Sequence, residues 1–208
     1  MYLKNYNLKN KTAVVTGAGK GIGRGITLQL ARAGADVVIS SRTEDDLTSL
    51  VNEVESMGRK ATPVLCDVTQ TAELENLAET AVTVGGIDIW VNNAGGLPDA
   101  TPRYLTRTPE DRWDAQMNLN LKAVFIACQV AAANMTEGAI INISSSSAKA
   151  QGNIKNGHIF DILSEHEFGH VFGCFLVPVL CPGLPRRARQ SAGARFPAGP
   201  ALYSTQFG

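Results

Sequence analysis

Short apolar runs alternate with segments of helical periodicity over the first two-thirds of the chain. The runs are rich in Val and Ile, and continuous apolar runs of this kind are typical of strands buried on both faces of a sheet. Between them, apolar residues recur every three or four positions, as on one face of a helix. The pattern predicts an α/β protein with a doubly wound parallel sheet that is truncated after its fifth strand. The predicted strands lie at residues 13–15, 37–39, 64–65, 87–91 and 139–143.

The ends of the predicted helices carry recognisable residue signals. Gly34 stops the first helix, since glycine adopts the backbone conformation of a helix C-terminus without strain. Thr43 is expected to cap the second helix, because acidic residues fill the first turn behind it. Pro109 opens a long helix that continues past Phe125 to about Met135.

The turn after the first predicted strand contains three glycines. Residues 14–23 read VVTGAGKGIG, with Gly17, Gly21 and Gly23 spaced Gly-x-x-x-Gly-x-Gly. Glycines let the backbone turn sharply and lie close to a pyrophosphate, while N–H groups of the following helix point at its oxygens. The alternative is a glycine-rich turn without a ligand, which many proteins contain. The order of strand, turn and helix favours a phosphate-binding turn.

The composition restricts the kinds of partner that the chain can have. With 208 residues, 44% of them hydrophobic, it can form one well-packed domain. The formal net charge is zero, which predicts no nucleic acid or membrane partner. No apolar run reaches the length of a transmembrane helix, and residues 1–11 lack the hydrophobic segment of a secretory signal. Four cysteines without a C-x-x-C pair favour reduced thiols in a cytoplasmic protein.

Polar residues follow each of the later predicted strands. Asp67 follows the third strand, Asn93 the fourth and Ser145 the fifth. Ligands of open parallel sheets bind beyond the carboxyl ends of the strands, so these side chains and the glycine turn are expected to face one crevice. Asp67 could instead be a plain helix cap, and Asn120 an exposed polar residue of the long helix. The position of Ser145 is less well defined, because residues 144–147 are all serine.

Four motifs together resemble those of the classical short-chain dehydrogenase/reductase family. Residues 16–23 match its T-G-x-x-x-G-x-G turn, and residues 66–68 match its Asp-Val step after the third strand. Residues 92–95 match its N-N-A-G motif. Asn120 and Ser145 match the asparagine and the serine of its active site.

The resemblance covers residues 9–147 and is greatest to the 7α-hydroxysteroid dehydrogenase and 3-oxoacyl-carrier-protein reductase types. It implies a Rossmann-type sheet and a homo-oligomeric oxidoreductase that moves hydride between a nicotinamide cofactor and a small carbonyl or alcohol substrate. No metal is predicted. The predicted site residues are Ser145 and Asn120 for catalysis and Gly17, Lys20, Gly21, Ile22, Gly23, Arg42, Asp67, Val68, Asn93, Ala94 and Gly95 for the cofactor.

The end of the second predicted strand indicates the type of cofactor. A carboxylate there binds the free ribose 2′-hydroxyl of NAD, whereas a cation accommodates the 2′-phosphate of NADP. Residues 40–42 are Ser-Ser-Arg, the first acid is Glu44, and Lys20 in the glycine turn adds a second cation. NADP is therefore predicted, with NAD less favoured. The alternative is that Arg42 is merely solvated.

The chain departs from the family where the proton chemistry is expected. The family's Tyr-x-x-x-Lys pair follows its serine, and the tyrosine is the general acid/base whose pKa the lysine lowers. Residues 155–162 read KNGHIFDI, and none of Tyr2, Tyr6, Tyr104 and Tyr203 has a lysine four positions later. The chain is therefore expected to be inactive as an oxidoreductase. A catalytically dead nucleotide-binding protein is the alternative.

Residues 1–150 are predicted to form the dinucleotide-binding domain, and residues 151–208 an atypical, partly disordered tail. After His170 the tail has arginines among prolines and glycines but no acid and no lysine, and a frameshift or altered splice would explain this change. The arginines lack the interleaved aromatics of a nucleic-acid arm. Residues 166–170 read HEFGH, a zinc motif when it lies on a helix, but no third ligand follows. A zinc hydrolase is a remote alternative.

Overall fold

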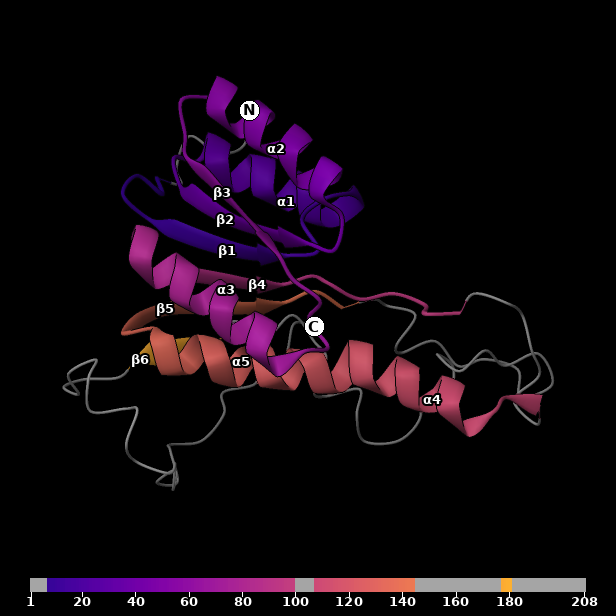
Figure 1. The fold of residues 1–208 in the computed structure, drawn as a ribbon. Helices are drawn as coiled ribbons and strands as arrows, with labels where there is room; N and C mark the ends of the chain where they lie inside the picture. Colours follow the sequence, from indigo (N-terminus) through magenta and orange to yellow (C-terminus); the bar gives the residue numbers. More distant parts are fainter. Residues whose placement is uncertain (1–6, 100–106, 145–176, 181–208) are drawn as a thin grey trace, which may run out of the picture.

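The computed structural model describes residues 7–99 and 107–144 and the backbone of residues 177–180. These residues form a six-stranded sheet with helices on both faces, in the strand order β3-β2-β1-β4-β5-β6 (Figure 1). The elements in chain order are β1 (Thr12–Thr16), α1 (Gly21–Arg32), β2 (Asp36–Ser41), α2 (Glu44–Ser56), β3 (Ala61–Leu65), α3 (Thr71–Val84), β4 (Ile89–Asn92), α4 (Glu110–Met117), the π-helix η2 (Asn118–Lys122), α5 (Ala123–Asn134), β5 (Glu137–Asn142) and β6 (Val177–Leu180).

The first five strands are parallel, as the apolar pattern predicts. Strand β1 lies between β2 and β4, with Val14 opposite both Val38 and Trp90. All five residues of β1 are buried, which explains why its sequence is apolar without alternation. Strand β3 begins at Ala61, earlier than predicted, and Ala61 pairs with Val37 through the backbone. The apolar pattern did not indicate this end of the strand, because it is only half-buried.

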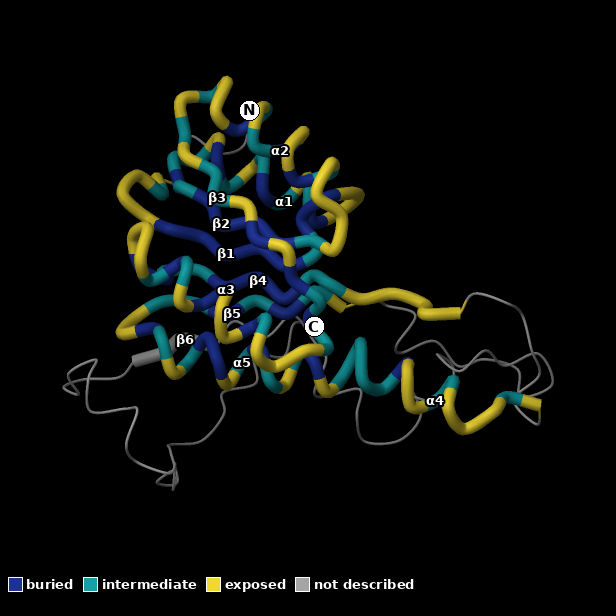
Figure 2. The backbone as a smooth tube through the Cα atoms, viewed as in Figure 1, coloured by how far each residue is buried: buried dark blue, intermediate teal, exposed yellow. Residues whose placement is uncertain are grey.

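Two apolar clusters join the helices to the sheet. On one face, α1 and α2 pack against the sheet through residues such as Leu47 and Leu50 of α2, both almost completely buried. On the other face, α3 and α5 pack over Trp90, which is fully buried. Figure 2 shows the consequence, with β1, β2 and β4 largely buried and the outer sides of the helices exposed. This burial of both sheet faces leaves the strand ends as the exposed part of the sheet.

The predicted long helix is divided into three parts. It begins at Glu110 with Pro109 as its N-cap, one residue later than predicted, and ends at Asn134. Between α4 and α5 the chain forms the π-helical segment η2, which apolar periodicity does not reveal. The side-chain Nδ2 of Asn120 donates to the Gln116 carbonyl at 3.1 Å, so a side chain contributes to the widened turn. Figure 1 shows α4 extending beyond the sheet in line with α5.

A sixth strand follows the parallel part of the sheet. Strand β6 pairs antiparallel with β5, and its Val177 lies opposite Ile140. It is an edge strand, which is where a proline such as Pro178 is tolerated, because proline has no backbone N–H to donate. The parallel sheet ends after its fifth strand as predicted, but the backbone of β6 continues it. The other residues of the predicted tail, including the HEFGH string, lie outside the described residues.

Among the described residues, no helix is both long and apolar enough to cross a membrane.

Candidate functional site

A cleft of about 500 Å³ lies beyond the carboxyl ends of β1, β2, β3 and β4. Parallel strands present these ends at one edge of the sheet, so loops distant in sequence meet there. The predicted cofactor residues all line this cleft except Gly21. The lining residues are Gly17, Gly19, Lys20, Ile22, Gly23, Ser41, Arg42, Thr43, Asp46, Cys66, Asp67, Val68, Asn93, Ala94, Gly95 and Leu119.

The glycine turn fits closely against the loop after β4. Gly17 has a φ of +63°, and a Cβ there would come within 2.9 Å of the Ala94 Cα. A Cβ at Gly23 would overlap the Gly17 carbonyl oxygen and the Asn93 Nδ2. Asn93 in turn donates from Nδ2 to the carbonyls of Thr16 (3.0 Å) and Gly17 (3.1 Å). Gly21 does not line the cleft, but its φ of +54° is a backbone conformation of the turn that favours glycine.

Thr16 connects the end of β1 to the same loop. Its hydroxyl accepts the backbone N–H groups of Asn93 (3.0 Å) and Ala94 (3.1 Å) and donates to the Val91 carbonyl at 3.3 Å. The hydroxyl is buried with the strand, so these hydrogen bonds compensate for its removal from water. Thr16 therefore holds the loop of residues 93–95 against the glycine turn.

The N-terminus of α1 faces the cleft through Ile22 and Gly23. Lys20 is its N-cap and supplies no side-chain acceptor to the N–H groups of the first turn, which also contains no acid. The positive end of the helix dipole is therefore not neutralised by a side chain of the turn itself. Such a helix end next to a glycine turn can bind a phosphate group.

Charged residues line the part of the cleft that adjoins β2 and β3. Lys20 forms an ion pair with Asp46, with 3.0 Å between Nζ and Oδ2. Asp67 accepts hydrogen bonds from the backbone N–H (3.0 Å) and the hydroxyl (2.8 Å) of Thr69. The backbone N–H of Thr69, its hydroxyl and the nearby positive charge of Arg42 hold the pKa of Asp67 below its usual value. Asp67 is thus an anion at neutral pH.

Asp46 lines the cleft although the sequence did not predict it there. Its place in the first turn of α2 suggested only a favourable interaction with the helix dipole. The argument for NADP considered only acids at the end of the second strand, whereas α2 packs over the glycine turn and brings Asp46 to Lys20, one of the two cations. Gly19, Ser41, Thr43, Cys66 and Leu119 also line the cleft without having been predicted.

Asn120 lies on η2 and contacts the loop after β4 instead of lining the cleft. Its Oδ1 accepts the backbone N–H of Gly96 at 2.9 Å, and its Nδ2 donates to the Gly96 carbonyl at 2.9 Å. In the structure, the amide of Asn120 therefore holds this loop in place. The predicted partner Ser145 lies outside the described residues, so the structure shows the predicted cofactor residues together and does not describe the predicted catalytic pair.

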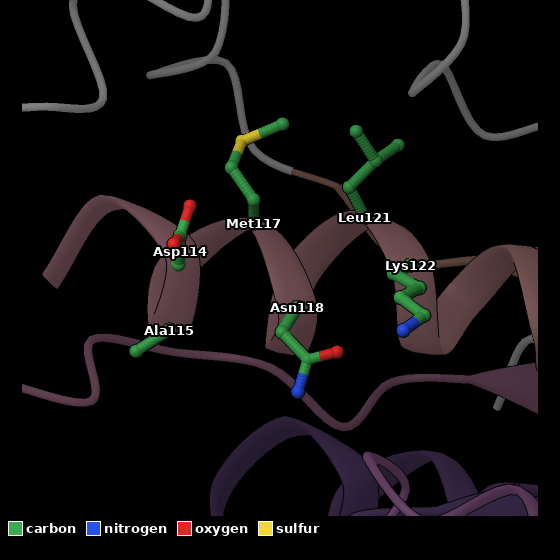
Figure 3. A pocket seen from close by; sticks show the side chains of 6 residues that line it. All are labelled: Asp114, Ala115, Met117, Asn118, Leu121 and Lys122. Atoms are coloured by element: carbon green, nitrogen blue, oxygen red, sulfur yellow. The ribbon is translucent and has the colours of Figure 1, made fainter. Parts of the chain in front are cut away.

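A second hollow of about 490 Å³ lies along α4 and η2 and shares no lining residue with the cleft. Figure 3 shows Met117 and Leu121 pointing to the same side of the helix. None of the predicted site residues lines it. The residues of this hollow are Asp114, Ala115, Met117, Asn118, Leu121 and Lys122.

The part of the chain that the structure describes contains no group of three His, Cys, Asp or Glu side chains that could hold a metal ion. The HEFGH string lies outside this part of the chain.

Comparison with known proteins identifies the class to which this fold and cleft belong. The model of the short chain dehydrogenase family matches residues 11–156, which is more than half of the chain. The chain therefore belongs to the short-chain dehydrogenase family.

Individual relatives resemble the first two-thirds of the chain. The 3-oxoacyl-acyl-carrier-protein reductase of Thermotoga maritima is 39% identical over 142 residues, which are 66% of this chain and 56% of the reductase. A solved 7α-hydroxysteroid dehydrogenase, in complex with NADH and 7-oxo glycochenodeoxycholic acid, has a TM-score of 0.70 and 34% identity. The match covers 77% of this chain and 62% of that one.

A solved short chain dehydrogenase from Burkholderia cenocepacia, in complex with NADP, also has a TM-score of 0.70. It is 30% identical, and the match covers 79% of this chain and 66% of that one. The chain spans about half the length of the curated relatives that it matches. Solved relatives thus hold either NADH or NADP.

Proposed function

We propose that this chain binds NADP in the cleft beyond the carboxyl ends of β1 to β4. The observation that carries the proposal is the assembly of glycine turn, α1 N-terminus, Arg42, Asp67 and the loop of residues 93–95 around one cleft. The residues fit a dinucleotide, because Gly17 and Gly23 let the turn pack closely on the loop of residues 93–95 and the N-terminus of α1 then faces the cleft, where its N–H groups can bind a pyrophosphate.

The preference for NADP over NAD rests on Arg42. Arg42 lies at the end of β2 and lines the cleft, where a 2′-phosphate is expected. A charge-assisted contact of this kind contributes about 1.5–3 kcal/mol, which corresponds to about 10- to 100-fold in affinity. The relative with bound NADP supports this choice and the relative with bound NADH supports the alternative, so the comparison alone does not select between them.

We further propose that the 208-residue chain does not transfer hydride at a useful rate. The bound cofactor would give hydride to a small ketone or take hydride from a small alcohol. Proton transfer needs a positioned acid/base, and the chain contains no Tyr-x-x-x-Lys pair. This leaves a nucleotide-binding member of the family with little or no reductase activity. Free thiols at Cys66 and Cys128 are consistent with a reducing compartment such as the cytoplasm.

The proposal is tested by calorimetric titration of the full chain with NADP and with NAD. Wild type is expected to bind NADP more tightly, and Arg42→Ala is expected to lose this preference because the 2′-phosphate loses its cation. The matched control is Arg32→Ala, which removes the same charge from an exposed position at the opposite end of α1. Equal affinity of wild type for both cofactors would contradict the preference, and no binding of either would contradict the proposed function.

A further inference from the structure

The ion pair between Lys20 and Asp46 joins an exposed side chain to a largely buried one. The Lys20 side chain is 77% exposed and the Asp46 side chain 21%, and the two meet at 3.0 Å in the wall of the cleft. A long exposed lysine side chain loses rotamer freedom in such a pair and can be released from it at low cost. Asp46, by contrast, is positioned by its surroundings.

Two features hold Asp46 at the cleft. It lies in the first turn of α2, where the helix dipole stabilises a carboxylate. Gly19 packs directly against it, since a Cβ at Gly19 would come within 2.9 Å of the Asp46 Cβ and 3.0 Å of the Ser41 Oγ. Ser41 Oγ also accepts the backbone N–H of Thr43 at 3.2 Å, which ties the start of α2 to the end of β2. The carboxylate therefore stays beside the glycine turn.

This arrangement affects NADP and NAD differently. A 2′-phosphate carries about 1.5 to 2 negative charges and requires a cation, whereas a 2′-hydroxyl does not. Asp46 neutralises Lys20 and adds a negative charge to the same wall. A phosphate that contacts Lys20 must therefore compete with Asp46 for it. NAD, which lacks the phosphate, meets no such competition.

From this geometry we propose that Asp46 is a specificity-determining residue that weakens the preference for NADP by holding Lys20. The inference rests on the proposed function, since it concerns the same cleft and the same cofactor. Arg42 then supplies most of the contact with the 2′-phosphate, and Lys20 supplies less than its charge suggests.

The test compares Asp46→Asn with Asp45→Asn by calorimetric titration of the full chain with NADP and NAD at low salt. Both variants remove one negative charge from the first turn of α2, but Asp45 is exposed and does not line the cleft. Asp46→Asn is expected to raise the affinity for NADP about three- to tenfold and to change that for NAD less than about twofold. Asp45→Asn is expected to change both less than about twofold. Equal gains in the two variants, or no gain in Asp46→Asn, would overturn the inference.

The double variant Lys20→Met/Asp46→Asn supplies a second measurement. In the Lys20→Met background, Asp46→Asn is expected to give less than half of its gain in wild type, because no lysine is left for the phosphate to recover. An undiminished gain would show that Asp46 acts by repelling the phosphate and not by holding Lys20, and would overturn the inference.

The two proposals fail in different ways. Titration of wild type reports on the proposed function, while the ratio of the NADP affinity of Asp46→Asn to that of wild type reports on Asp46. A fall in NAD affinity in Asp46→Asn would show instead that the carboxylate binds a ribose hydroxyl, and would overturn this inference while leaving dinucleotide binding intact. Absence of binding in wild type and in Asp46→Asn overturns both.

Discussion

Cys66 occupies an unusual position for a thiol, because it is 4% exposed and still lines the edge of the cleft. Burial raises its pKa to about 12, and the negative charges of Glu73 and Asp67 act in the same direction. Only a thiolate is strongly nucleophilic, so the native thiol is inert near neutral pH. The cleft therefore contains a cysteine without a reactive sulfur.

We predict that iodoacetamide labels Cys66 at about pH 8 much more slowly in the native protein than in urea. Because the folded pKa lies above the unfolded value, the contribution of this thiol to stability is present below about pH 9 and is lost as the pH rises toward 12. Peptide mass spectrometry measures the labelling at this residue. Equal rates in the native and unfolded protein would show that the thiol is accessible and ionises normally.

Asn120 shows the difference between what a motif identifies and what the position of a residue in the fold adds. Its match to the family motif could be recognised from the sequence, but its hydrogen bonds to Gly96 and Gln116 depend on a π-helical turn. The apolar pattern predicted one continuous helix over these residues, without this widened turn. A role for Asn120 in catalysis stays a prediction.

At the level of elements, the glycine turn and the start of α1 pack closely against the loop after β4. A Cβ at Gly23 would overlap the Gly17 carbonyl and Asn93. A Cβ at Gly25, two residues further along the same helix, would meet open space, with no atom of another element within 4 Å. One helix thus contains a glycine that the packing requires and another that it does not.

We predict opposite effects for alanine at these two positions. Gly23→Ala is expected to lower the free energy of unfolding by about 1–3 kcal/mol, because backbone atoms must move to admit the methyl group. Gly25→Ala is expected to raise it by about 0.5–1 kcal/mol through helix propensity alone. Urea unfolding followed by circular dichroism measures both. A neutral Gly23→Ala would mean that the turn can relax without cost.

At the scale of the whole molecule, binding and catalysis are separable. The described residues assemble the nucleotide cleft from four strand ends, but the pair that would transfer the proton is absent from the chain. The parallel sheet ends at β5, and the antiparallel β6 pairs with only part of it. We therefore expect dinucleotide binding without turnover.

We predict that the pure, monodisperse chain does not oxidise NADPH at a useful rate with a panel of ketones and steroids. Loss of positioned acid/base help costs about 100- to 10,000-fold, so turnover is expected below about 0.1 per second. The related reductase from Thermotoga maritima, assayed in parallel, serves as the positive control. Turnover of about one per second would contradict the prediction and would mean that another residue, such as His158, donates the proton.

The class of fold and most of the residues that line the cleft could be predicted from the order of amino acids. Buried parallel strands must be apolar on both faces, so β1, β2, β4 and β5 could be recognised from their apolar runs, and residues after strand ends must share one edge of the sheet. Gly17 and Gly23 could be recognised because only glycine permits the positive φ of one and the close contacts of the other. Apolar runs and glycine spacing are patterns along the chain and are therefore visible in the order of residues, whereas the contact between Gly23 and Asn93 is a tertiary one.

The contacts between charged residues, by contrast, depend on how the elements pack. Asp46 and Lys20 are separated along the chain by a helix and a strand, and their contact depends on how α2 packs over the glycine turn. The π-helical turn at Asn120 and the pairing of β6 with β5 likewise depend on contacts between distant segments. Electrostatic energy varies with distance in space, and packing sets that distance. The balance of charge at the proposed 2′-phosphate position is therefore a property of the fold.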